Sequence, residues 1–249
     1  MPSISFLNHL GALLTLWLLL CCGAPAAENG RILMVTEATF PPYEFRDGNA
    51  ILGIDPEIMR EVARRTGREL VIEDMSFDSV ITAVVSGKAG VAASGITVTP
   101  ERRRKVDFSI PYVEAAQVII VPKGSPIRKR EDIRGKRIGV QHGATGDIYV
   151  TRNIQQPERF PNGALAVAAV AAGKVDAAVI DQDPATMYVA GNDRLEILPE
   201  PLTSESYAIA VRKGDTALLQ DINGTIAALK ASGKLEEIRN AYAAMQVKS

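Results

Sequence analysis

The sequence is poor in the residue types on which many enzymes and small disulfide-rich domains depend. It contains 2 cysteines and 2 histidines among 249 residues. A disulfide-stabilised scaffold and a multi-histidine metal site are therefore close to excluded. Aromatic residues make up only 5% of the chain, and its glycines and prolines follow no fixed period. That composition argues against fibrous and repeat architectures.

Charge of neither sign dominates the chain. There are 28 Lys and Arg against 29 Asp and Glu, which gives a net charge of -1. A nucleic-acid-binding protein that works through bulk positive charge is therefore excluded. With 47% hydrophobic and 23% charged residues, the composition is that of a folded chain with a packed core. Its length corresponds to one or two domains.

Residues 1–27 are predicted to be a signal peptide. The run 6–20 is mostly apolar, and the small residues Ala24 and Ala26 that follow match a cleavage site. This run is shorter than the roughly 20 apolar residues that a membrane-spanning helix needs. A buried N-terminal helix is the alternative interpretation. We therefore expect export to the periplasm, with no membrane insertion after cleavage.

Both cysteines, Cys21 and Cys22, lie within this predicted signal peptide. Cleavage near residue 27 would leave a mature chain without a thiol, and hence without redox or thiol chemistry. Lipid attachment to one of these cysteines is the alternative. The bulky Leu20 disfavours it, because a small residue is expected before a lipidated cysteine.

Short apolar runs alternate with amphipathic stretches along the rest of the chain. This alternation predicts an α/β fold with a mostly parallel sheet. Strands are expected at 32–35, 70–72, 91–93, 115–121, 137–140, 175–180 and 207–211. Helices are expected at 55–65, 76–86, 147–154, 164–172, 184–190, 216–231 and 235–244. We expect Asp55 to cap the first of these helices, with Pro56 in its first turn.

Two segments of the chain echo each other. Each consists of a helix end, a Gly-Lys turn at Gly87 or Gly173, and a buried strand. The echo suggests two similar α/β units, although turns of this kind are also common in unrelated chains. Ligands of open α/β sheets bind beyond the carboxyl ends of the strands. The residues at those ends are Ser94, Gly95 and Asp181.

Four segments could carry binding chemistry. The segment 36–45 is a Pro-rich loop with aromatic and acidic side chains, including Glu37 and Phe40. The segment 94–102 combines hydroxyls and free backbone groups with Arg102, a combination that suits a carboxylate. The segment 141–147 is a strand-to-helix turn of small residues. Asp181 ends a mostly apolar strand, where a carboxylate is costly to bury without a positive partner.

These segments together supply an acid for a cation, an arginine for an anion, and aromatic faces. That set matches a zwitterion that carries an α-carboxylate and an α-ammonium group. It is a poor match for catalysis, because only His142 remains after the predicted cleavage and no Gly-x-Ser-x-Gly elbow occurs. We therefore expect a binding protein and not an enzyme, with no cofactor and no metal.

At these residues the chain resembles the family 3 periplasmic solute-binding proteins, the amino-acid receptors of ABC importers. The resemblance covers nearly all of residues 31–244. It rests on the order and spacing of seven motifs: TEATFPPY (36–43), LGID (52–55), SGITVTPER (94–102), VDFSIPY (106–112), GKRIGVQ (135–141), GKVDA (173–177) and IAVRKG (209–214).

The resemblance implies the two-lobed, type II periplasmic-binding-protein fold, in which two crossing hinge strands join α/β lobes that close on a ligand. Crossings near 115–120 and 206–210 would give lobe one as 28–117 plus 208–249. Lobe two would then be 118–207.

The resemblance also implies how the ligand backbone is held. Arg102 would grip the α-carboxylate, helped by the backbone N–H groups of Thr97 and Thr145. Asp181 would take the α-ammonium, together with the Gly95 carbonyl and the Thr97 hydroxyl.

The rest of the implied site faces the ligand side chain. Phe40 and Phe77 would sandwich it. Glu37 would reach toward its far end with Ser94 beside it, and Gln141 is a further contact. An acid between two aromatic faces favours a cationic or hydrogen-bonding ligand.

We therefore expect reversible capture of a polar or cationic L-amino acid, with arginine, lysine or ornithine favoured. The partners would be that amino acid and the permease subunits of an ABC importer, and the protein would be a monomer. Two alternatives stay open on the same scaffold. One is a dehydratase acting on arogenate-like or prephenate-like (cyclohexadienyl) substrates, with Glu37 as its acid. The other is a ligand-sensing subunit for a separate receptor.

Overall fold

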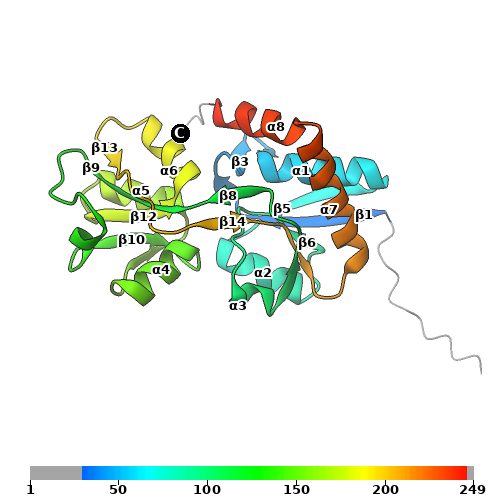
Figure 1. Cartoon of the computed structure of the whole chain (residues 1–249), viewed down its shortest axis with the longest axis horizontal. Coiled ribbons are helices and arrows are strands. Elements are labelled where there is room, and N and C mark those ends of the chain that lie inside the picture. The colour runs from blue at the N-terminus through cyan, green and yellow to red at the C-terminus, as the bar shows by residue number, and fades with distance from the viewer. Residues whose placement is uncertain (1–29, 246–249) are drawn as a thin grey trace, which may run out of the picture.

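Two mixed β-sheets, each covered by helices, form two lobes that lie side by side (Figure 1). The structure, a computed structural model, describes residues 30–245. The predicted signal peptide, with both cysteines, lies outside the described residues. Within residues 30–245, no helix combines the length and the apolar character needed to cross a membrane.

The first sheet has the strand order β5-β1-β6-β15-β7. Its strands are β1 (Arg31–Thr36), β5 (Glu69–Asp74), β6 (Val91–Ala92), β7 (Val106–Phe108) and β15 (Ala210–Arg212). Its helices are α1 (Ile54–Thr66), α2 (Phe77–Val85), α3 (Pro100–Arg103), α7 (Thr216–Ala231) and α8 (Lys234–Ala243). The hairpin strands β2 (Thr39–Phe40), β3 (Glu44–Asp47) and β4 (Ala50–Leu52) form a small separate sheet.

The second sheet has the order β11-β10-β12-β9-β13. Its strands are β9 (Gln117–Pro122), β10 (Ile138–Gln141), β11 (Glu158–Phe160), β12 (Ala177–Asp181) and β13 (Leu195–Ile197). A short 3-10 helix (Arg130–Ile133) and the helices α4 (Thr145–Asn153), α5 (Gly163–Ala171) and α6 (Gln182–Ala190) accompany it.

Each sheet is buried on both faces, which explains the apolar runs in its strands. Successive side chains of a strand point to opposite faces. In β1, Met34 therefore packs with Ile58 of α1, while Val35 packs with Val80 of α2. The second sheet repeats this arrangement, with Ile120 and Val121 of β9 in two different core clusters.

Strands β8 (Val113–Ala115) and β14 (Glu205–Tyr207) cross between the two lobes. They pair antiparallel, with Glu205 opposite Ala115. These strands overlap the expected segments 115–120 and 206–210, and they begin two residues and one residue before them, respectively.

Four expectations about local structure are wrong. The sheets are mixed and not mostly parallel, because β15 and β9 run antiparallel to their neighbours. The single strand expected at 207–211 is divided between β14 and β15. The loop expected at 36–45 contains β2 and the start of β3. Asp55 does not cap α1: Gly53 occupies that position, and the Asp55 carboxylate accepts a hydrogen bond from the Gly95 N–H instead, at 3.0 Å.

Candidate functional site

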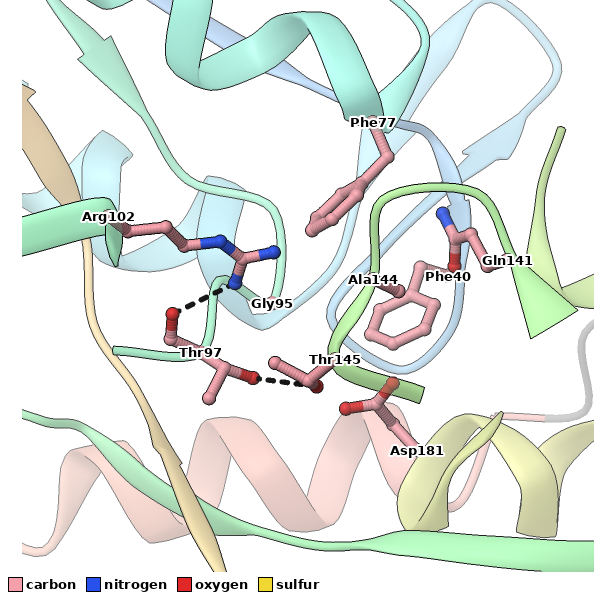
Figure 2. Close-up of a pocket in the computed structure, with 9 residues that line it drawn as sticks. All are labelled: Phe40, Phe77, Gly95, Thr97, Arg102, Gln141, Ala144, Thr145 and Asp181. Atoms are coloured by element: carbon pink, nitrogen blue, oxygen red, sulfur yellow. Dashed lines mark hydrogen bonds between the residues drawn. The ribbon is translucent and has the colours of Figure 1, made fainter. Parts of the chain in front are cut away.

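A pocket lies between the lobes, at the carboxyl ends of strands from both sheets (Figure 2). The empty space at this site amounts to about 240 Å³, part of which is open solvent. The lining residues are Phe40, Phe77, Gly95, Thr97, Arg102, Gln141, Ala144, Thr145 and Asp181. Eight of the ten residues that we predict from the sequence are among them. The other two, Glu37 and Ser94, lie just behind the wall, where the Glu37 N–H donates to the Ser94 Oγ at 2.9 Å.

Arg102 enters the pocket from α3. Pro100 begins this helix, and the Thr99 hydroxyl caps it by accepting from the Arg102 N–H at 3.1 Å. The guanidinium donates to the carbonyl of Thr97 at 2.9 Å and, across the lobes, to that of Gly143 at 3.2 Å. Burial lowers the pKa of Arg102, and the negative charges of Asp181 and Glu205 oppose that shift. An arginine in a protein stays charged, so the pocket contains a fixed cation.

Asp181 ends β12 on the opposite side of the pocket (Figure 2). Its Oδ1 accepts a short hydrogen bond from the Tyr207 hydroxyl. Burial, reinforced by the charge of Glu205, raises the pKa of Asp181 to about 6, although Tyr207 and Arg102 favour the ionised form. Arg102 and Asp181 thus place opposite charges around one space, as required to hold a zwitterion.

Two aromatic rings line the same space. Phe77 begins α2 and lies over the Arg102 guanidinium, with 5.3 Å between the Cζ atom and the ring centroid. Phe40 lies against Gly95, which has a φ of +51°. A Cβ atom at Gly95 would come within 2.7 Å of the Phe40 ring. Only glycine lets the backbone approach the ring this closely while taking a left-handed conformation.

Glu205 is a functional candidate that the sequence analysis missed. It lies on the crossing strand β14, and its Oε2 accepts from the Thr97 and Thr145 hydroxyls at 2.8 Å each. Its Oε1 accepts from the Thr203 hydroxyl at 2.8 Å. The expected crossing at 206–210 begins one residue after Glu205, and Glu205 falls outside all seven motifs. The sequence therefore carries no clear signal for it.

A cluster of buried acids lies behind Phe40 and Ser94. Burial raises the pKa of Glu37 to about 7, despite hydrogen bonds from Thr39 and Gln141. Glu44 lies next to Asp55, and burial followed by the neighbouring charges of Asp55 and Glu37 raises its pKa well above the usual range. Burial likewise raises the pKa of Asp55 to about 6. No ion pair to Glu37, Glu44 or Asp55 occurs within residues 30–245.

Hydrogen bonds between the lobes surround the pocket. The Tyr43 hydroxyl donates to Asp183 at 2.6 Å, and the Tyr188 hydroxyl donates to the Thr39 carbonyl at 2.6 Å. The Gln141 amide reaches Glu37 at 3.5 Å. Together with the bond from Arg102 to Gly143, these contacts hold the two lobes closed over the site.

Comparisons with known proteins agree on one family. The family model "Bacterial extracellular solute-binding proteins, family 3" matches residues 32–245. The probable histidine-binding protein of Neisseria gonorrhoeae is 32% identical over 90% of this chain and 87% of its own length. The arginine-binding extracellular protein ArtP of Bacillus subtilis (strain 168) is 32% identical over 90% of this chain and 92% of its own.

A solved structure shares both the fold and much of the sequence. The arginine-bound form of truncated ArgBP from T. maritima aligns with a TM-score of 0.77 and 43% identity, covering 81% of this chain and 97% of that one. The predicted two-lobed α/β fold is confirmed by this likeness.

Proposed function

The chain belongs to the family 3 bacterial extracellular solute-binding proteins, and from this premise we propose that it captures a cationic L-amino acid, with arginine favoured over lysine and ornithine. The observation that carries the proposal is the placing of Arg102 and Asp181 around one pocket between the lobes (Figure 2). ArtP, which is named for arginine, and the arginine-bound ArgBP support the same ligand class.

Arg102 and Asp181 would hold the parts that all α-amino acids share. The guanidinium meets the α-carboxylate, and the Asp181 carboxylate meets the α-ammonium. Hydrogen bonds to charged groups contribute about 1.5–3 kcal/mol each. A few of them account for a Kd on the order of 1 μM, which corresponds to about -8 kcal/mol.

The balance of charge supports a ligand with an additional positive group. Arg102 lies near two carboxylates, that of Asp181 in the pocket lining and that of Glu205 behind it, and Glu37 lies just behind the wall. A zwitterion is neutral and leaves this negative excess unchanged. A side-chain guanidinium beside Glu37, between Phe40 and Phe77, would offset it and would gain cation–π attraction.

In this role the protein undergoes no covalent chemistry. A ligand that bridges the lobes favours the closed form only through its higher affinity for that form. We propose that the chain is exported to the periplasm by residues 1–27, acts as a monomer and delivers its ligand to the permease subunits of an ABC importer. The family and the relatives named above are binding proteins.

Isothermal titration of refolded, ligand-stripped protein against the twenty amino acids tests the proposal. We expect micromolar or tighter binding of L-arginine and weaker binding of L-glutamine. Preference for L-glutamate or L-leucine would contradict the cationic ligand class. Absence of binding to every amino acid would contradict the proposed function itself.

A further inference from the structure

Glu205 lies where both lobes and a crossing strand meet. We propose that Glu205 is a positioning residue that fixes the Thr97 hydroxyl as a hydrogen-bond acceptor and so directs the pocket to require an α-ammonium group. This inference rests on the proposed function, because it concerns how an amino acid is recognised.

A threonine hydroxyl has one proton to donate. The hydroxyls of Thr97 and Thr145 both donate theirs to the same Glu205 oxygen, Oε2, at 2.8 Å. The two hydroxyl oxygens lie 3.5 Å apart, at the outer limit of a hydrogen bond, and Figure 2 marks this contact with a dashed line. Because both protons point to Glu205, neither hydroxyl can donate to the other or to a ligand. Each can only accept.

Thr145 already has a partner for its accepting side, since the Gln117 amide donates to its Oγ1 at 3.0 Å. Thr97 has no such donor among the described residues. The acceptor lone pairs of Thr97 therefore remain for the ligand, and Figure 2 shows its hydroxyl on the same side of the pocket as Asp181. An ammonium group carries three donors and no acceptor, so it matches Thr97 and Asp181 together. A carboxylate at the same place would meet acceptors only.

The same contacts join the two lobes. Thr97 follows β6 in the first lobe, Thr145 begins α4 in the second, and Glu205 belongs to the crossing strand β14. The set of hydrogen bonds to Oε2 is therefore complete only when the lobes approach as they do here.

A simpler role for Glu205 is charge balance, since its charge acts on both Arg102 and Asp181. The two roles differ in the part of the ligand that they affect. Loss of acceptor orientation weakens recognition of the α-ammonium alone. Loss of charge balance alters binding of every ligand that meets Arg102, whether or not the ligand has an α-ammonium.

The experiment compares L-arginine with desamino-arginine, which lacks only the α-ammonium, on wild-type protein and on Glu205→Ala. We expect the wild type to bind L-arginine at least about tenfold more tightly than the analogue. In Glu205→Ala, affinity for L-arginine should fall by about tenfold or more while affinity for desamino-arginine changes by less than about threefold. These factors follow from one charged hydrogen bond of about 1.5–3 kcal/mol.

Two further variants serve as an independent test of the acceptor and as a control. Thr97→Val removes the acceptor directly and should show the same ammonium-selective loss, even if Glu205→Ala does not fold. Glu114→Ala removes an exposed carboxylate from the partner crossing strand β8 and should leave both affinities unchanged. Equal weakening of both ligands by Glu205→Ala, or no weakening of either, would overturn the inference. Failure of the wild type to bind any amino acid would instead remove the proposed function.

Discussion

The two ends of the pocket differ in their balance of charge. At one end, Arg102 faces Asp181, and both have hydrogen-bond partners within the protein. At the other end, Glu37 lies in front of the buried carboxyl groups of Glu44 and Asp55, with no ion pair to any of them in the described part of the chain. The first end is complementary to a dipolar group. The second has a surplus of acid that only a cation or bound protons can neutralise.

General affinity and ligand choice therefore arise from separate parts of the site. The balanced end suits features that all α-amino acids share, so it contributes affinity without selecting a side chain. The unbalanced end favours a positively charged ligand side chain over a neutral one, and it therefore determines which side chain is preferred. Changes at the two ends should be separable by suitable ligands.

The largest effect is expected from Arg102→Ala at the balanced end. Loss of a two-pronged charged hydrogen bond of about 1.5–3 kcal/mol per prong should weaken L-arginine binding by roughly a hundredfold or more. Binding of agmatine, which has no α-carboxylate, should change little. Calorimetric titration measures both affinities, and the melting temperature of ligand-free protein should stay within a few degrees. A similar loss for agmatine would show that Arg102 does not act on the carboxylate.

Glu37→Gln should produce the next largest effect, at the unbalanced end. Removing the Glu37 carboxylate should weaken L-arginine binding by about tenfold to a hundredfold, because a charged hydrogen bond becomes a neutral one. L-citrulline, which has the same shape but no side-chain charge, is the matched ligand and should lose less than about threefold. Equal losses for the two ligands would place the arginine guanidinium elsewhere.

The pH should change affinity and stability in opposite directions. Ligand binding needs ionised Glu37 and Asp181, whose pKa values are raised to about 7 and about 6. L-Arginine affinity should therefore fall as the pH is lowered from 8 to 5, by up to about tenfold per pH unit for each protonated group. Titrations in matched buffers measure this slope, and Glu37→Gln should flatten it near pH 7.

The ligand-free protein should show the reverse trend. Raised pKa values mean that the folded state binds more protons than the unfolded state between the ordinary carboxylic range and pH 6–7. The stabilisation is fully present below that ordinary range and is lost as the pH rises through the folded-state values of Asp55, Asp181 and Glu37. The melting temperature at pH 5.5 should exceed that at pH 8. The opposite order would show that these acids are solvated in the ligand-free form.

The smallest effect is expected from Glu44→Gln, behind the unbalanced end. Glu44 Oε2 and Asp55 Oδ1 are buried, and neither receives a hydrogen bond of ordinary geometry among residues 30–245, although the Tyr112 hydroxyl lies beside Asp55. A single proton held between the two carboxyl groups would satisfy both atoms. Glutamine offers an N–H in its place and keeps the carbonyl that accepts from Ser94, so unfolding free energy at pH 7 should change by less than about 1 kcal/mol.

Urea unfolding measures this change, with the double variant Glu44→Gln plus Asp55→Asn as its counterpart. Two amides in this space have too many donors, so the double variant should be destabilised by more than the sum of the single ones. Additive effects would show that the two carboxyl groups share no proton.

The sequence predicted the balanced end far better than the unbalanced one. Arg102 and Asp181 lie at the ends of a Pro-initiated helical turn and an apolar strand, which are local signals. Asp55 has an equally local signal for capping a helix, namely the Pro that follows it. Its carboxylate instead accepts from Gly95, which lies 40 residues along the chain. Buried contacts between distant segments override local preferences, and a single sequence does not show them.

Glu205 illustrates the same limit at the hinge. Its partners Thr97, Thr145 and Thr203 come from both lobes and from the hinge segment itself, so its role exists only in the assembled molecule. The antiparallel strands β9 and β15 were mispredicted for a related reason. Each directly follows a crossing strand, and the direction in which it enters its sheet depends on the hinge and not on its own residues.

The strand order also sets when each lobe can be completed during synthesis. All five strands of the second sheet come from one unbroken stretch, residues 117–197. The first sheet places β15, from residues 210–212, between β6 and β7. Because the chain is synthesised from its N-terminus, the first sheet lacks its strand between β6 and β7 until almost the whole sequence has been made. The second sheet can be completed once residue 197 has been made, while the first sheet cannot be completed before β15 has been made.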